Sequence, residues 1–249
     1  MQQFQPTGFR ILPPVVKNLL IINALFFLAT LGIGAAFGID LTEKMGMHYF
    51  GSPLFHPYQL ITYMFMHANF SHIFFNMFAL WMFGNVLENY WGPKRFMTYY
   101  FITGLGAILI QMGVNYFQIR TAQANLPPEI ISDVLTNGYK YLQEGKNFIN
   151  PDAANLNILY HTPTIGASGA VFGLLLAFGM MFPNSLIYIY FAIPIKAKWF
   201  VILYGAMELF FGVSNSGGDN VAHFAHLGGM LFGFLLIIFW NKRIKNKFF

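Results

Sequence analysis

Six stretches of predominantly apolar residues follow one another along this chain of 249 residues. A transmembrane helix needs about 20 consecutive apolar residues, because the hydrocarbon core of a bilayer is about 30 Å thick. Only 9% of the residues are charged, whereas a soluble domain has about 25%. The chain has too few charges to cover a water-soluble surface, so the bilayer is its expected solvent. The predicted spans are residues 15–38, 71–90, 95–117, 164–182, 199–213 and 220–240.

Basic residues orient these spans, since Lys and Arg are enriched in cytoplasmic loops. With six spans, ten basic residues fall on one side of the membrane: Arg10, Lys17, Lys94, Arg95, Lys196, Lys198, Lys242, Arg243, Lys245 and Lys247. The other side has Lys44, Arg120, Lys140 and Lys146. This bias predicts that both termini are cytoplasmic, as in a bacterial inner membrane. An odd number of spans would place the basic C-terminal tail outside.

The sequence therefore predicts an all-α membrane protein, a six-transmembrane-helix bundle that forms one domain over residues 1–249. An interfacial loop, residues 39–70, follows the first span, and a long outer loop, residues 118–163, joins the third and fourth spans. The second span is expected to begin near Ser71, because Asn69 and Ser71 are residues that cap helix N-termini. The net charge of +5 reflects this topology, and no nucleic-acid partner is expected.

Few polar side chains lie within the predicted spans, and such residues mark functional sites by default. They are His72, Asn76, Ser168, Glu208, His223 and His226. Spans two, four and six all enter from the outer face. At a rise of 1.5 Å per residue, the polar groups of the second, fourth and sixth spans lie within about 10 Å of that face. The sequence thus predicts that side chains from three helices meet at one depth.

Ser168 and His226 together can carry out nucleophilic acyl transfer, in which a histidine takes the hydroxyl proton and returns it to the leaving amine. Ser168 is expected in the first turn of its helix, between the small residues Gly166 and Gly169, where free backbone N–H groups suit an oxyanion. Gly229 and Gly233 form a G-x-x-x-G pair after His226, which permits close helix packing.

No Asp or Glu is expected at the right depth to orient His226, so the prediction is a Ser–His dyad. Phe172, one turn after Ser168, is expected to stack on the imidazole instead. Glu208 is expected in the cytoplasmic half of its helix as a protonated, hydrogen-bonded carboxyl. His223 is expected to be structural or to face the outer loop, with a role as the base left open. A lone Ser168 among small residues is also compatible with simple helix packing.

The motifs that carry this chemistry are Gly166-Ala167-Ser168-Gly169, Ala225-His226-Leu227-Gly228-Gly229 through Gly233, and His72-Ile73-Phe74-Phe75-Asn76. Together, over about residues 60–240, they resemble the rhomboid family of intramembrane proteases. The resemblance implies that Ser168 is the nucleophile and His226 the base. It also implies an oxyanion hole made of His72, Asn76 and the Ser168 backbone N–H. The fifth span and the loop Gly212–Asn220, with Gly217-Gly218, would gate substrate entry.

Three features depart from the family pattern. Tyr58-Gln59 replaces a frequent Trp-Arg pair, Phe172 replaces a frequent Tyr, and the outer loop of residues 118–163 is longer than the family core requires. The expected reaction is endopeptidase cleavage of transmembrane protein substrates within the lipid bilayer, at a site that opens to the outer face. No cofactor and no metal are expected, and the sequence does not define an oligomeric state.

Other functional classes fit the residues less well. None of the seven histidines is followed by Glu, as the H-E-x-x-H motif of membrane metalloproteases requires, and no Asp lies in any span for aspartyl chemistry. With no cysteine, thiol chemistry is excluded. A haem protein ligated by His72 and His226 would leave the serine motif unexplained. An inactive relative that escorts membrane helices remains an alternative, and a transporter fits least.

Overall fold

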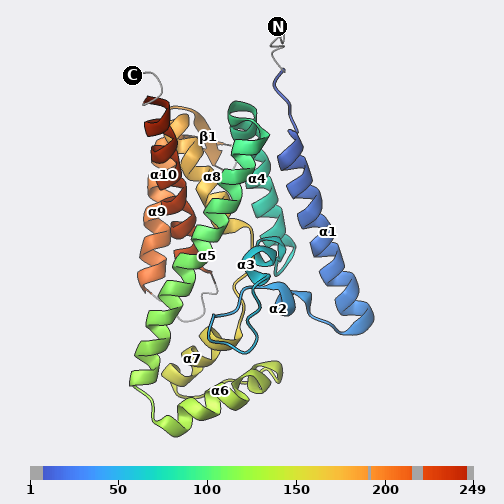
Figure 1. The fold of residues 1–249 in the computed structure, drawn as a ribbon, viewed down its shortest axis with the longest axis vertical. Coiled ribbons are helices and arrows are strands. Elements are labelled where there is room, and N and C mark those ends of the chain that lie inside the picture. Colours follow the sequence, from blue (N-terminus) through green and yellow to red (C-terminus); the bar gives the residue numbers. More distant parts are fainter. Residues whose placement is uncertain (1–7, 190–191, 215–220, 246–249) are drawn as a thin grey trace.

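In a computed structural model of the chain, which describes residues 8–189, 192–214 and 221–245, long helices form a bundle (Figure 1). The expected all-α membrane bundle is confirmed. Within these residues, five helices are long and apolar enough to cross a bilayer, while α8 is apolar but shorter. The bundle helices are α1 (Pro14–Phe37), α4 (Phe70–Trp91), α5 (Pro93–Ala124), α8 (Ser168–Met181), α9 (Ala197–Ser214) and α10 (His223–Lys245).

The beginning of α1 and the end of α10 lie at the same end of the bundle (Figure 1). The antiparallel strands β1 (Leu186–Ile189) and β2 (Ile193–Lys196) lie near that end and connect α8 to α9. This hairpin was not expected from the sequence. The opposite end has α2 (Leu41–Met45), α3 (Gln59–Thr62), the 3-10 helix η1 (Tyr63–Phe65), α6 (Pro128–Gln143) and α7 (Pro151–His161).

The fourth predicted span is wrong at its start, because the chain enters the bundle as an extended segment before α8 begins. Thr164 pairs with Met47 through two backbone hydrogen bonds of 2.9 and 2.8 Å. Gly166 N–H then donates to the carbonyl of Tyr63 at 2.9 Å. These bonds satisfy the backbone of the extended segment, so the helix can start at Ser168 instead of Thr164. The first turn of α8 therefore lies inside the bundle.

Close packing of α8 on its neighbours depends on glycine. A Cβ atom at Gly229 of α10 would collide with the carbonyl oxygen of Gly169, and one at Gly169 would collide with the Cβ of Ala107 on α5. At Gly233, a Cβ would collide with the hydroxyl of Tyr99, which donates to the carbonyl of Gly173 at 2.8 Å. Small residues thus bring α5, α8 and α10 into backbone-level contact, as membrane helices require.

Two polar side chains stabilise the first turns of α4 and α1. Asn69 caps α4, because its side chain accepts the N–H of His72 at 2.9 Å, so the expected cap near Asn69 and Ser71 is present. Glu88 of α4 accepts the backbone N–H groups of Val15 and Val16 at 2.9 and 2.8 Å. The first turn of α1, which begins with prolines and lacks its own side-chain cap, is held in this way.

The loop of residues 39–70 is organised around Gln59, whose side chain is fully buried. Its amide nitrogen donates to the carbonyls of Lys44 and Leu54 at 3.2 and 2.9 Å. Its amide oxygen accepts the N–H groups of His48 and His56 at 3.3 and 3.1 Å. At the position of the family's frequent Arg, a neutral amide therefore satisfies the backbone of this loop.

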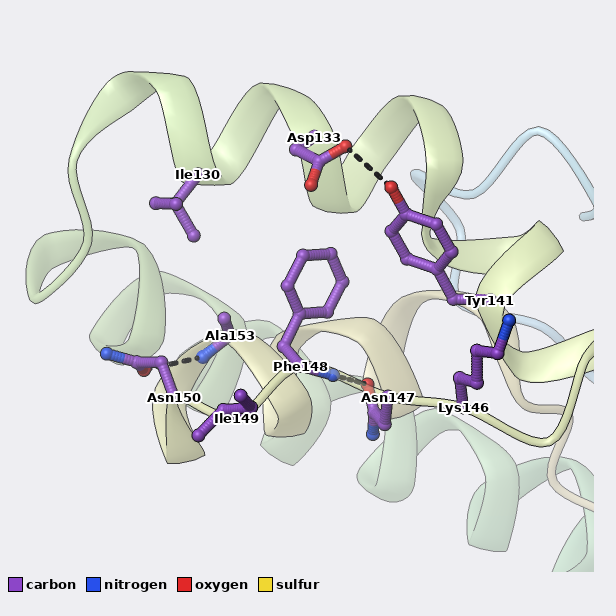
Figure 2. Close-up of a pocket in the computed structure, with 9 residues that line it drawn as sticks. All are labelled: Ile130, Asp133, Tyr141, Lys146, Asn147, Phe148, Ile149, Asn150 and Ala153. Atoms are coloured by element: carbon purple, nitrogen blue, oxygen red, sulfur yellow. Dashed lines mark hydrogen bonds between the residues drawn. The ribbon is translucent and has the colours of Figure 1, made fainter.

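The long outer loop contains a helical hairpin, α6 and α7, which lies beyond the end of the bundle (Figure 1). It has a small core of its own, made of Ile119, Ala122, Leu126, Val134, Ala153 and Leu156. Figure 2 shows Phe148 projecting toward α6 from the connection between the two helices, beside Tyr141. The ring centroids of Phe148 and Tyr141 are 5.4 Å apart. The outer loop is thus a folded element that extends α5.

Candidate active site

Ser168 and His226 face each other across the contact between α8 and α10. The Oγ atom of Ser168 and the Nε2 atom of His226 are 2.8 Å apart, a hydrogen-bond distance. His226 is buried, whereas Ser168 is half-buried. The glycine contact at Gly169 and Gly229 explains the pairing, because each glycine lies on the same helix as one of the two residues and close to it in sequence. The arrangement provides a nucleophile and a base within hydrogen-bond reach.

Phe172 lies under the imidazole of His226. The two ring centroids are 4.1 Å apart and the planes differ by 7°, so the rings stack. Tyr204 of α9 packs against Phe172, with its ring centroid 5.0 Å from that of Phe172. The stacking resists tilting of the imidazole out of its plane.

Gly166 opens the space between His72 and Ser168. Its φ of 118° lies in the region that favours glycine. A Cβ atom there would lie 2.8 Å from Nε2 of His72 and 3.6 Å from Oγ of Ser168. Nδ1 of His72 accepts the N–H of Ala68 at 3.4 Å, which leaves Nε2 to carry the proton of a neutral ring. His72 therefore presents an N–H donor toward the Ser168 side of this space.

Asn76 lies one turn after His72 and is buried. Its amide nitrogen donates to the carbonyl of His72 at 3.0 Å, so one of its two N–H groups is bonded to its own helix. The structure thus brings His72 next to Ser168 and Gly166. Asn76 lies on the same helix, and the hydrogen bond of its side chain is with the backbone of His72 and not with Ser168.

The expectation that no carboxylate reaches His226 is wrong. Oε2 of Glu208 lies 2.8 Å from Nδ1 of His226, and the carboxyl group is buried, with 6% of the residue exposed. The expected position of Glu208 in the cytoplasmic half of its helix is also wrong. Glu208 lies in the second half of α9 (Ala197–Ser214), level with His226 in the first turn of α10.

The same carboxylate oxygen also contacts His223, whose Nδ1 atom lies 2.7 Å from Oε2 of Glu208. Two imidazole N–H donors at one oxygen favour an ionised carboxylate, which accepts only, over the protonated group expected from the sequence. His223 is therefore linked to Glu208 rather than to Ser168.

These three side chains are also the one group of potential metal ligands found in the described residues, with their ligand atoms within 4.8 Å of one another. Ligands around a tetrahedral zinc ion, at roughly 2.0–2.1 Å from the metal, are about 3.3 Å apart. The contacts of 2.7 and 2.8 Å are shorter than this and have the length of hydrogen bonds. These distances fit hydrogen bonds between the side chains better than coordination of a shared cation.

Several residues at the site had no role in the sequence interpretation. Gln111 of α5 accepts the backbone N–H of Ala225 at 3.1 Å and holds the first turn of α10, while Tyr204 supports Phe172. Gln111 could have been noticed in the sequence, because it is itself a polar residue within the third predicted span. The loop Gly212–Asn220, expected to help gate the site, falls largely outside the described residues, as do Gly217 and Gly218.

Known proteins are similar to this chain over most of its length. A family model described as the Rhomboid domain matches residues 54–125 and 129–243. RHOMBOID-like protein 12, mitochondrial, of Arabidopsis thaliana is 25% identical over 189 residues, which cover 76% of this chain and 47% of that protein. Rhomboid protein 1, mitochondrial, of Saccharomyces cerevisiae is 26% identical, with 74% and 42% covered. Rhomboid protease AarA of Providencia stuartii is 27% identical, with 70% and 53% covered. The chain thus spans about half the length of these curated relatives.

Proposed function

Because the chain belongs to the rhomboid family, we propose that this integral membrane protein is an intramembrane serine endopeptidase. Its substrates are membrane proteins, and the bonds it cleaves lie in or near their transmembrane segments. The observation that carries the proposal is the distance of 2.8 Å between Oγ of Ser168 and Nε2 of His226. Similarity to a relative named as a protease, AarA, supports the same activity.

The reaction begins when Oγ of Ser168 attacks the carbonyl carbon of the scissile bond. Nε2 of His226 takes the hydroxyl proton as the C–O bond forms, and the resulting imidazolium returns it to the leaving amine. Water then attacks the acyl-enzyme, with His226 again acting as the base, and Ser168 is released. The half-buried position of Ser168 leaves its hydroxyl accessible to a substrate backbone.

The negative charge that develops on the carbonyl oxygen needs hydrogen-bond donors. The first N–H groups of a helix have no acceptor within that helix, so the Ser168 backbone N–H at the start of α8 is suited to this role. Nε2 of His72 faces the same space beside Gly166. Asn76 would contribute its second N–H group. Each such donor is worth about 10²–10³-fold in kcat.

The expected location is a bacterial inner membrane, with both termini in the cytoplasm and the site open to the outer face. The beginning of α1 and the end of α10 at one end of the bundle support an even number of crossings. The excess of basic residues on that side supports its cytoplasmic placement. The reaction needs neither a metal nor an organic cofactor, because the side chains provide the nucleophile, the base and the oxyanion donors.

The test is cleavage of a transmembrane model substrate in proteoliposomes by the wild type, Ser168→Ala and His226→Ala. The wild type is expected to cut, and both variants are expected to lose at least about 10³-fold in rate while remaining folded. Cleavage by Ser168→Ala at the wild-type rate would refute the proposal. Substrate that still co-purifies with a wild type unable to cut would instead favour an escort role.

A further inference from the structure

One buried carboxylate is the main polar feature of α9. The buried residues of this helix are Ala197 and Val201 near its start and Glu208 in its second half. The rest of the helix exposes large apolar side chains, including Leu203, Met207 and Phe210, which suit a lipid environment. Burying a carboxylate beside such a surface is strongly unfavourable unless the charge is paired. Glu208 is therefore expected to have hydrogen-bond partners that offset the loss of hydration.

The partners of Glu208 connect it to the proposed nucleophile. Nε2 of His226 accepts the Ser168 hydroxyl, so a neutral ring must carry its proton on Nδ1. That proton points at Oε2 of Glu208 over 2.8 Å. The hydrogen bonds thus run in one direction, from Ser168 to His226 and from His226 to Glu208.

We propose that Glu208 is the positioning residue of a Ser168–His226–Glu208 triad, an inference that rests on the proposed protease function. The carboxylate selects the tautomer of His226 that can accept the Ser168 proton. It then stabilises the imidazolium that forms when Ser168 attacks, and remains ionised throughout. Glu208 acts through His226 and makes no contact with the reacting atoms.

Stacking on Phe172 does not make this role redundant. Parallel rings with centroids 4.1 Å apart resist tilting of the imidazole, but a ring can still turn within its own plane without losing the stack. Such a turn would move Nε2 away from Ser168. The hydrogen bond from Nδ1 to Glu208 fixes the in-plane direction of the imidazole.

His223 contacts the same carboxylate oxygen of Glu208 and lies on the same helix as His226. It precedes His226 by three residues, so both imidazoles project from neighbouring positions of α10. Its contact of 2.7 Å with Oε2 supplies a second donor, which helps to keep Glu208 ionised in an apolar environment. Among the described residues, the other titratable groups around this cluster are His72 of α4 and Tyr204 of α9.

The triad depends on the contact between α9 and α10. On either side of Glu208, a Cβ at Gly205 would lie 3.3 Å from Met230, and one at Gly212 would lie 3.1 Å from Phe224. These small residues let α9 approach α10 closely where the carboxylate reaches His226. Displacement of α9 from α10 would withdraw Glu208 from His226 while leaving Ser168 and His226 in place on α8 and α10.

The test compares Glu208→Gln and Glu208→Asp in proteoliposomes. Two quantities are measured: kcat and KM for a transmembrane substrate, and the rate at which a fluorophosphonate labels Ser168, per folded molecule. Glu208→Gln is expected to lower kcat by about 10²–10⁴-fold and the labelling rate in parallel, with KM nearly unchanged. Glu208→Asp keeps the charge and is expected to be the more active variant.

The relative activity of these two variants distinguishes a positioning role of Glu208 from a packing role. Gln matches Glu in size and can still form hydrogen bonds, so a structural role would favour Gln over Asp. The matched control is Glu88→Gln, which changes the other buried glutamate at the contact between α4 and α1 and is expected to leave kcat unchanged. If Glu208→Gln does not fold, a folded Glu208→Ala variant replaces it, and an unchanged kcat and labelling rate in Glu208→Ala would overturn the triad.

The outcomes also separate this inference from the proposed function. If Ser168→Ala abolishes cleavage but Glu208→Gln retains the wild-type kcat and labelling rate, the triad is wrong and the dyad stands. A Glu208→Gln variant at least as active as Glu208→Asp would also overturn it. Cleavage that persists in Ser168→Ala would instead remove the protease function itself.

Discussion

The imidazole of His226 lies parallel to the ring of Phe172, with 4.1 Å between centroids and 7° between planes. Aromatic contacts of this kind are worth about 0.5–1.5 kcal/mol beyond the area they bury. Phe172→Leu is therefore expected to lower kcat by roughly 2–10-fold, while Phe172→Tyr keeps the ring and stays close to the wild type. Steady-state cleavage measures both. Phe178→Leu, further along α8, is the control, and a Phe172→Leu variant with wild-type kcat would show that stacking is dispensable.

His72 offers a second prediction, because its Nε2 faces the space left open by Gly166. Removing one oxyanion donor lowers kcat by about 10²–10³-fold in well-studied serine proteases. His72→Ala is expected to show a loss of this size, with little change in KM expressed as the mole fraction of substrate in the bilayer. A His72→Ala variant in which only KM changes would assign this side chain to substrate binding instead.

The crossing of α8 and α10 gives a prediction about packing. A Cβ at Gly229 would collide with backbone atoms of Gly169, which cannot move aside as a flexible side chain can. Gly229→Ala is expected to lower stability by about 1–3 kcal/mol and to reduce cleavage by separating His226 from Ser168. Thermal unfolding in detergent measures the first effect. Gly113→Ala, where nothing lies within 4 Å, is the matched control and should be tolerated.

Stability is expected to depend on pH through His67, in the loop before α4. Burial, followed by the nearby His72, lowers the pKa of His67 to about 4, and the side chain is almost fully buried. The unfolded chain, with a pKa near 6.5, then binds a proton between about pH 6.5 and 4 that the folded protein does not. The contribution of neutral His67 to the free energy of unfolding is therefore fully present above about pH 6.5. Below that pH, the free energy of unfolding falls by up to about 1.4 kcal/mol per pH unit.

Thermal unfolding of the wild type and His67→Leu between pH 7.5 and 5 tests this dependence. The variant is expected to lose less stability than the wild type as the pH falls. The control is Met66→Leu, at the neighbouring buried position without a titratable group, and it is expected to leave the slope unchanged. Equal slopes for the wild type and His67→Leu would contradict the assignment.

The sequence predicted the bundle well because apolar length and helix caps are local signals. The helices α1, α4, α9 and α10 begin within a few residues of their predicted starts, and Asn69 marks the beginning of α4. Ser168 and His226 were identified from motifs that resemble a family, and their contact depends on glycine packing that those motifs contain.

The contact between Glu208 and His226 was missed because Glu208 was placed in the cytoplasmic half of its span, although it lies nearer the predicted outer end at Val213 than the start at Trp199. What the sequence could not predict is the point at which α8 starts. The extended segment before Ser168 is fixed by bonds to Met47 and Tyr63, which are distant in sequence. No local pattern indicates such long-range pairing. The role of Gln59 was missed for the same reason, since its four backbone partners include residues up to 15 positions away in the sequence.

The central claim is that Ser168 is a nucleophile activated by His226. Its most direct test is to label the wild-type protein with a fluorophosphonate in proteoliposomes and to identify the modified residue by mass spectrometry. We expect a single adduct on Ser168, and its loss in His226→Ala at equal folded fraction. A wild type that cleaves substrate without labelling, or that carries the adduct on another serine, would contradict this mechanism.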